Sequence, residues 1–248
     1  MSSSDIEREY AAYITAVDEK PASFFIDKSL ITDAPNSNFP FMAYLSVQLM
    51  EPDEIGFAGE DEFEKLSTID EEVEALAGQN AIFAGRKMGD GTNNYYFYTN
   101  AEGALEAPFK AVMSSLPEYN FEIGHEFDED WKTYIEFLFP SSFEQNVMRN
   151  DIVRVALLEA GDDSSKPRKT DHFIEFKSKQ SATLFEEKAR TMGFNSSTNS
   201  KGLFRKTFTV NLVREDIPAE LDKVTFELKN LASELGGEYD GWETFVVQ

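Results

Sequence analysis

Cysteine, histidine and long apolar runs are scarce or missing in this sequence of 248 residues, which has no cysteine and only two histidines. Without cysteine there is no disulfide framework, no thiolate nucleophile and no cysteine-built zinc site. No run reaches the roughly 18 apolar residues that a membrane-spanning helix needs. Serines and charged residues follow Met1, where a secretory signal would place an apolar stretch. We therefore expect a cytoplasmic protein that does not insert into a membrane.

Acidic side chains outnumber basic ones, with 46 Asp and Glu against 23 Lys and Arg, for a net charge of −23. This charge argues against direct binding of nucleic acid or of an anionic membrane surface. The hydrophobic fraction of 41%, which includes 22 Phe, is too high for a disordered acidic chain. The length fits one large domain or two of about 100–130 residues.

The negative charge is distributed unevenly along the chain. Residues 1–140 contain 8 basic and 28 acidic side chains, a net charge of −20, whereas residues 141–248 contain 15 and 18, a net charge of −3. Such asymmetry indicates two units with different surfaces.

The apolar pattern of the first half predicts alternating strands and helices. Residues 1–27 fit either a helix or a hairpin, and the turn at Asp18–Pro21 favours the hairpin. Beyond it we predict strands and helices from apolar spacings of two and of three to four residues. The strands are 39–49, 81–87, 94–99 and 119–125, and the helices are 63–78 and 106–116.

The second half repeats this order after a connecting region. There we predict a strand at 131–139 and a helix at 142–159, opened by a capping box of Ser142 and Gln145. Ser178 and Gly193 are the expected cap and stop of the next helix. The remaining elements are strands at 170–177, 194–199, 203–213 and 242–247, a turn at 200–202 and a helix at 218–235.

Each half therefore has the order β-α-β-β-α-β. This order is typical of the ferredoxin-like fold, in which two helices cover one face of an antiparallel sheet. We predict an α+β protein of two such two-layer sandwiches, with domains at 1–127 and 128–248.

Motifs of common enzymes are absent. There is no G-x-G-x-x-G loop, no Walker-type loop and no G-x-S-x-G elbow. His125 lies in an acidic segment, Gly124–Asp130, that could hold a divalent cation but lacks the glycine and terminal glutamate of an EF-hand loop. A solvated acidic loop is the simpler interpretation, and we expect neither catalysis nor a cofactor.

A second cluster surrounds the other histidine, and it allows two interpretations. Carboxylates and His172 could form a metal-dependent hydrolase site, with Asp162, Asp163 and Asp171 as ligands and His172 as acid or base. Alternatively, Arg168 and these aspartates could form an ion-pair network that holds the loop before the strand.

A third set consists of carboxylates in the first predicted helix and the turn before it. They suit the positive end of the helix dipole and solubility, and their summed field would also attract a basic partner. The residues are Glu60, Asp61, Glu62, Glu64, Glu71, Glu72 and Glu74.

Part of the second half resembles a known family. The stretch GDDSSKPRKTDHFIEF at 161–176, the later Gly193-Phe194 and the preceding WKTYIEFLFP at 131–140 are similar to the regulator of ribonuclease activity B, over about residues 128–248. Residues 5–125, with Ala84-Gly-Arg-Lys and a tyrosine-rich strand, resemble a family of unknown function that occurs in front of such modules.

The resemblance implies a non-catalytic protein that binds endoribonuclease E, through the basic scaffold of that enzyme, and so modulates RNA decay. An acidic chain suits an arginine-rich partner. We expect the surface to use the helix carboxylates and the cluster of Asp162, Asp163, Arg168, Asp171 and His172. A homodimer is a further expectation, because exposed edge strands can pair between chains.

Overall fold

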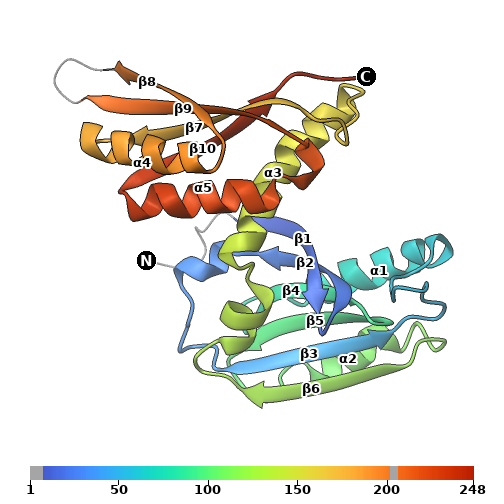
Figure 1. Cartoon of the computed structure of the whole chain (residues 1–248). Coiled ribbons are helices and arrows are strands. Elements are labelled where there is room, and N and C mark those ends of the chain that lie inside the picture. Colours follow the sequence, from blue (N-terminus) through green and yellow to red (C-terminus); the bar gives the residue numbers. More distant parts are fainter. Residues whose placement is uncertain (1–7, 202–205) are drawn as a thin grey trace. The chain divides into compact units, whose positions relative to one another are not determined.

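The computed structural model describes residues 8–201 and 206–248, and the chain divides into two compact units at Pro140 and Ser141 (Figure 1). Each unit is built on its own antiparallel sheet. The division lies later than the boundary after residue 127 that we expected from the sequence, because the segment at 128–139 packs with the first unit.

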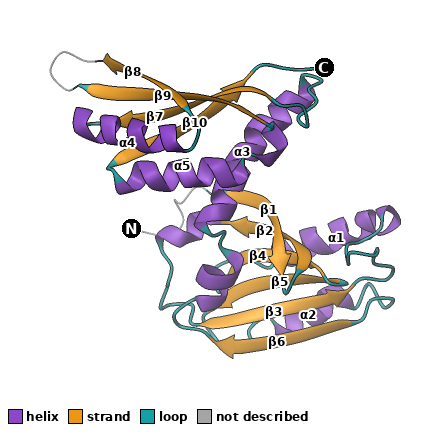
Figure 2. Ribbon diagram, viewed as in Figure 1, coloured by secondary structure: helices purple, strands orange, loops and turns teal. Residues whose placement is uncertain are grey.

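The first unit has a six-stranded sheet in the order β1-β2-β4-β5-β3-β6. Two helices lie on one face of this sheet, α1 (Phe63–Glu74) and α2 (Glu106–Met113) (Figure 2). The strands are β1 (Tyr10–Val17), β2 (Lys20–Asp27), β3 (Phe41–Gln48), β4 (Ala81–Gly89), β5 (Thr92–Thr99) and β6 (Phe121–Phe127).

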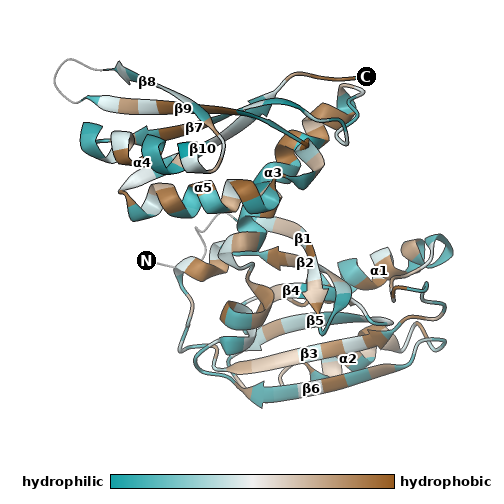
Figure 3. Ribbon diagram, in the orientation of Figure 1, coloured by the Kyte–Doolittle hydropathy of each residue, from teal (hydrophilic) through white to brown (hydrophobic). Residues whose placement is uncertain are grey.

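The elements from β3 to β6 form the predicted ferredoxin-like sandwich. Their order is β3-α1-β4-β5-α2-β6, and their strands lie in the order β4-β5-β3-β6. The hairpin of β1 and β2, also predicted, extends the sheet beyond β4. Hydropathy alternates along α1 (Figure 3), and the apolar side, with Leu66, Ile69 and Val73, is buried in the core against Tyr95 and Phe97.

The prediction of a strand at 131–139 is wrong, because residues Thr133–Leu138 form a π-helical turn. The Asp128 carboxylate accepts hydrogen bonds from the backbone N–H groups of Lys132 (2.8 Å) and Thr133 (3.0 Å) and so begins the turn. The aromatic residues of 131–139 suggested a strand, but in the structure their rings pack on the sheet of the first unit.

That turn covers the sheet face opposite α1 and α2. Along β5, Tyr95 and Phe97 point into the helix-covered core, and Tyr98 points the other way, stacking on Trp131 with ring centroids 4.0 Å apart. Trp131 Nε1 donates to the carbonyl oxygen of Phe39 (3.0 Å). Segment 128–139 is therefore an integral layer of the first unit.

The second unit is also ferredoxin-like, as predicted. Its sheet has the order β10-β7-β9-β8, and α4 and α5 lie on one face (Figure 2). In the core, Phe185 of α4 and Leu228 of α5 pack with Ile174 and Phe176. The elements are α3 (Ser142–Glu159), β7 (Arg168–Phe176), α4 (Lys179–Thr191), β8 (Asn195–Lys201), β9 (Thr207–Asp216), α5 (Asp222–Glu234) and β10 (Gly237–Thr244).

The second half differs from the sequence prediction in its last strand and in the turn before β9. The last strand begins at Gly237 rather than Trp242 and ends at Thr244, and a bulge between Tyr239 and Gly241 breaks the alternation that would have marked its start. Ser200 and Lys201, expected in a turn, instead pair with Phe208 and Thr207 at the end of β8, whereas Gly202 and the start of the strand expected at 203–213 lie outside the described residues.

The capping box of α3 is shifted by one residue from the predicted pair. The Ser141 hydroxyl accepts from the Glu144 N–H (3.3 Å), and the Glu144 carboxylate accepts from the Ser141 N–H (2.6 Å).

Within residues 8–201 and 206–248, no helix combines the length and apolarity needed to cross a lipid bilayer.

Replacing Trp131 tests whether segment 128–139 stabilises the first unit. The side chain is 1% exposed, so Trp131→Ala should lower the free energy of unfolding of this unit by about 4 kcal/mol. Hydrogen-exchange mass spectrometry at increasing urea concentrations reports each unit separately. Phe63→Ala, which removes a 53% exposed ring from the same unit, is the control and should change little. Equal losses in both units would contradict the assignment.

Candidate functional site

The carboxylates of α1 and the turn before it are mostly on the surface of the first unit. Glu60, Asp61 and Glu64 are exposed, as are Glu71 and Glu72. None of these five forms an ion pair with a basic side chain among the described residues. Their charges are therefore directed to solvent, where they add to one field.

Glu62 and Glu74 differ from this pattern. Glu62, which we expected on the partner-binding surface with the other helix carboxylates, is instead buried beyond the end of β3, and its Oε1 accepts a hydrogen bond from the Met50 N–H (3.0 Å). Burial and the nearby Glu62 carboxylate both raise the pKa of Tyr119. Glu74 is half-buried, and this burial raises the pKa of its carboxyl group.

Asp162 and Arg168 form a buried ion pair at the start of β7. Arg168 Nη2 lies 2.5 Å from Asp162 Oδ2, and both side chains are almost fully shielded from solvent. Burial disfavours the charged carboxylate, but hydrogen bonds from the Val247 N–H (2.7 Å), Ser164 Oγ (2.8 Å) and Arg168 outweigh it and hold the pKa of Asp162 below its usual value. The pair connects the loop after α3 to the C-terminal segment.

Asp163 and Asp171 do not join this pair through their side chains. The Asp163 carbonyl accepts from Arg168 Nη1 (3.0 Å), while its half-exposed carboxylate accepts from Ser165. Asp171 projects from the other face of β7, where it lies 3.2 Å from Lys169 Nζ and accepts from Asn211 (3.3 Å). Strand alternation separates it from Arg168 and His172.

His172 is fully buried on the helix-covered face of the second sheet. Its Nδ1 is 2.8 Å from the Tyr239 hydroxyl, and its Nε2 is 3.9 Å from Asp216 Oδ2. Burial raises the pKa of Asp216, but the nearby His172 ring and the hydrogen bonds from Arg214 outweigh it, and the net direction is downward. The histidine is therefore part of the core, out of reach of a substrate.

The five residues of the predicted cluster thus separate into a buried ion pair, two surface carboxylates and a core histidine. Within the described part of the chain, no three His, Asp or Glu side chains form a group that could hold a metal ion. Of the expected ion-pair network only the Asp162–Arg168 pair is present, and the aspartates and His172 do not converge on a common site as the hydrolase interpretation requires. His125 lies in β6, with Nε2 3.4 Å from Glu102, rather than in an acidic loop.

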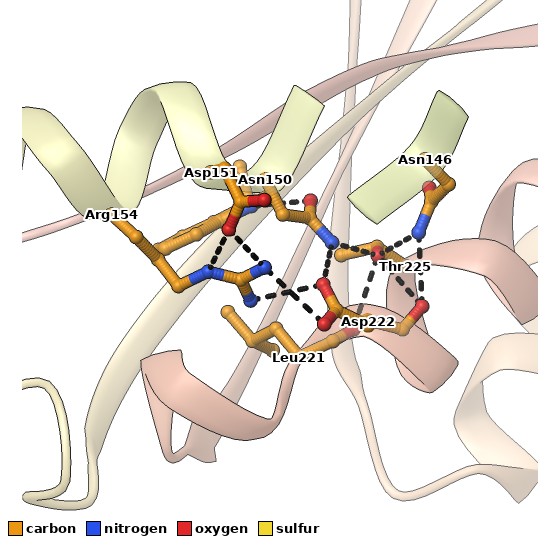
Figure 4. A network of polar contacts seen from close by, with 8 residues as sticks. Asn146, Asn150, Asp151, Arg154, Leu221, Asp222 and Thr225 are labelled. Atoms are coloured by element: carbon orange, nitrogen blue, oxygen red, sulfur yellow. Dashed lines mark hydrogen bonds and ion pairs between the residues drawn. The ribbon is translucent and has the colours of Figure 1, made fainter. Parts of the chain in front are cut away.

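Sequence reasoning missed a polar network between α3 and α5 (Figure 4). Asn146 Nδ2 donates to Thr225 Oγ1 (2.8 Å), and Asn150 Nδ2 donates to Thr225 Oγ1 (2.8 Å) and Asp222 Oδ1 (2.7 Å). Arg154 extends the network with bonds from Nη1 and Nη2 to the two oxygens of Asp222 (2.9 and 3.2 Å).

Trp242 of β10 closes the same network, because its Nε1 donates to Asn150 Oδ1 (2.9 Å). The signal in the sequence was the spacing of Asn146, Asn150 and Arg154, four residues apart on one side of α3. An apolar stripe is usual on a packed helix face, so a polar stripe at this spacing indicates a specific partner.

The Asp162–Arg168 pair predicts a pH-dependent stability. The folded pKa of Asp162 lies below the unfolded value, so its contribution is present above about pH 4 and is lost as pH falls through the folded pKa. Asp162→Asn leaves Arg168 buried without its counterion and should cost about 3 kcal/mol at pH 7.

Urea denaturation from pH 7 to acid measures the difference between wild type and Asp162→Asn, which should shrink below about pH 4. Asp171→Asn, at a surface pair on the same strand, should stay within about 1 kcal/mol of wild type. A difference for Asp162→Asn that is constant over this range would show that the pair does not act as described.

Two families match the chain. Residues 9–139 match a family of unknown function, DUF695, and residues 148–244 match the regulator of ribonuclease activity B. No curated protein matches the chain.

Solved structures show only weak likeness. An unknown protein from Galdieria sulphuraria is 12% identical, with 84% of this chain and 99% of that chain covered and a TM-score of 0.25. A candidate glycine cleavage system transcriptional repressor is 9% identical, with 83% and 98% covered and a TM-score of 0.24. At these scores the likeness carries no argument. The match over residues 9–139 covers more than half of the sequence, and the chain therefore belongs to the DUF695 family, with a segment matching the regulator of ribonuclease activity B behind that domain.

Proposed function

We propose that this protein is a non-catalytic regulator that binds an endoribonuclease, ribonuclease E or another nuclease with a basic segment, and restrains its action on RNA. The match of residues 148–244 to the regulator of ribonuclease activity B is the observation that carries the proposal. A cytoplasmic location, where RNA decay takes place, belongs to the same proposal.

The charge distribution supports a protein contact rather than an RNA contact. Residues 1–140 have a net charge of −20, and the exposed carboxylates of α1 belong to this unit. A field of this sign attracts a basic protein segment and repels RNA. The first unit thus supplies long-range attraction, which changes the association rate more than the final affinity.

In this proposal the second unit determines the shape of the surface that contacts the nuclease. Asp162, Arg168 and His172 are buried and act by holding the loop and strand in place, whereas Asp163 and Asp171 remain within reach of a partner.

Self-association is a separate part of the proposal. Among the described residues, the edge strand β8 pairs only with β9, so its other edge is free to pair with a second chain. Sedimentation of the free protein should detect a dimer if β8 pairs in this way.

Binding kinetics against purified ribonuclease E test the proposal directly. The full chain should bind immobilised enzyme at low salt, with an association rate that falls steeply as ionic strength rises. RNA added alone should give no signal. Absence of binding to the enzyme at low salt would refute ribonuclease E as the partner.

Neutralising the exposed carboxylates tests which unit attracts the partner. A variant of the first unit should lower the association rate about tenfold at low salt and leave the dissociation rate nearly unchanged. A variant of the second unit with the same change in net charge is the control and should have a smaller effect. The first carries E60Q, D61N, E64Q, E71Q and E72Q, and the control carries E187Q, E227Q, E234Q, E238Q and E243Q. Equal effects would mean that only total charge matters.

A further inference from the structure

The second unit contains a hollow of about 300 Å³ between α3, α5 and β10, which we call the α3–α5 hollow. Its apolar lining includes Val153 and Trp242, and its charged lining includes Arg149, Lys229 and Asp240. The volume is at the lower end of the range for small-molecule sites. None of these five residues belongs to the surface proposed above for a nuclease.

Hydrogen bonds hold the walls of this hollow in place. Asn146 and Asn150 line it, and their amide groups are bonded to Thr225, Asp222 and Trp242 in the network of Figure 4. A wall fixed by such bonds is formed before a ligand arrives, which lowers the entropy cost of binding.

Two cations line the hollow without a counterion. Arg149 projects from α3 and Lys229 from α5, and within the part of the chain that the structure describes neither forms an ion pair with a carboxylate. Burial and the charge of Arg149 both lower the pKa of Lys229. Arg149 is exposed and Lys229 is half-buried, so in a unit with a net charge of only −3 their unpaired charges give this side of the hollow a positive potential that suits an anion.

The backbone of β10 departs from regular strand geometry beside the α3–α5 hollow. The bulge between Tyr239 and Gly241 faces the hollow, and Gly241 has φ +143°, a value that favours glycine. A Cβ atom at Gly241 would meet no atom within 4 Å, so the glycine is required for backbone conformation rather than space. Bulges commonly redirect side chains beside binding sites.

We propose that the α3–α5 hollow binds a small anion with a flat apolar body, of the aromatic carboxylate class. The carboxylate lies between Arg149 and Lys229, and the ring packs against Trp242 and Val153. Asp240 is exposed and disfavours ligands with a second negative charge. This site is independent of nuclease binding, so either proposal can fail alone.

Indole N–H signals in a ¹⁵N NMR spectrum of the full chain test this site, because the protein has only two tryptophans, Trp131 and Trp242. Benzoate is the probe, and it should shift the Trp242 signal, with a dissociation constant of about 1 mM, and leave the Trp131 signal unchanged. Benzyl alcohol, of similar shape but uncharged, should bind at least tenfold more weakly, and so should acetate, which lacks the ring.

Variants separate the role of the two cations from general charge. R149Q/K229Q should weaken benzoate binding at least tenfold, and the dispersed indole signals show that the variant is folded. K229R should retain binding, because it keeps the charge. The control R190Q/K223Q removes one arginine and one lysine from exposed positions of the same unit and should bind as wild type does. Unchanged binding in R149Q/K229Q, or no shift of the Trp242 signal with benzoate, would overturn the proposal.

Discussion

Polar side chains are buried in both units, and a buried polar group must find a partner inside the protein because water cannot reach it. Asp162 pairs with Arg168, the asparagines of α3 donate to Thr225 and Asp222, and Asp128 accepts from the N–H groups of Lys132 and Thr133. These contacts join segments that the hydrophobic cores alone would leave free. The loop before β7, the packing of α3 on α5 and the cover over the first sheet all depend on them.

The same requirement explains which sequence predictions were confirmed. Regular elements were predictable wherever one side of a helix or strand is apolar, as in α1 and α5, because burial follows from periodicity. Residues 131–139 were not, because a run of aromatic residues is compatible with a strand and with a turn that covers a sheet. At the candidate site, sequence proximity suggested one cluster around His172. Alternation along the predicted strand at 170–177 already separates Asp171 from His172, but the inward turn of Asp162 toward Arg168 is visible only in the tertiary contacts.

The two proposed binding functions use opposite charges on different units. The first unit offers exposed carboxylates to a basic protein segment, whereas the second offers two unpaired cations, Arg149 and Lys229, to a small anion. The two units therefore differ in their electrostatic properties. The net charge of −23 comes almost entirely from residues 1–140, at −20, and gives no indication of the nearly balanced second unit, at −3.

Strand β5 has aromatic side chains on both of its faces, with Tyr95 and Phe97 toward the helices and Tyr98 toward Trp131. A single inserted or deleted residue inside β5 would exchange the two sets, because side chains alternate with a period of two. Both layers of the first unit would then lose their aromatic contacts at once. The number of residues inside β5 is therefore fixed by two packed layers at once, whereas the connections outside the strand are not constrained in this way.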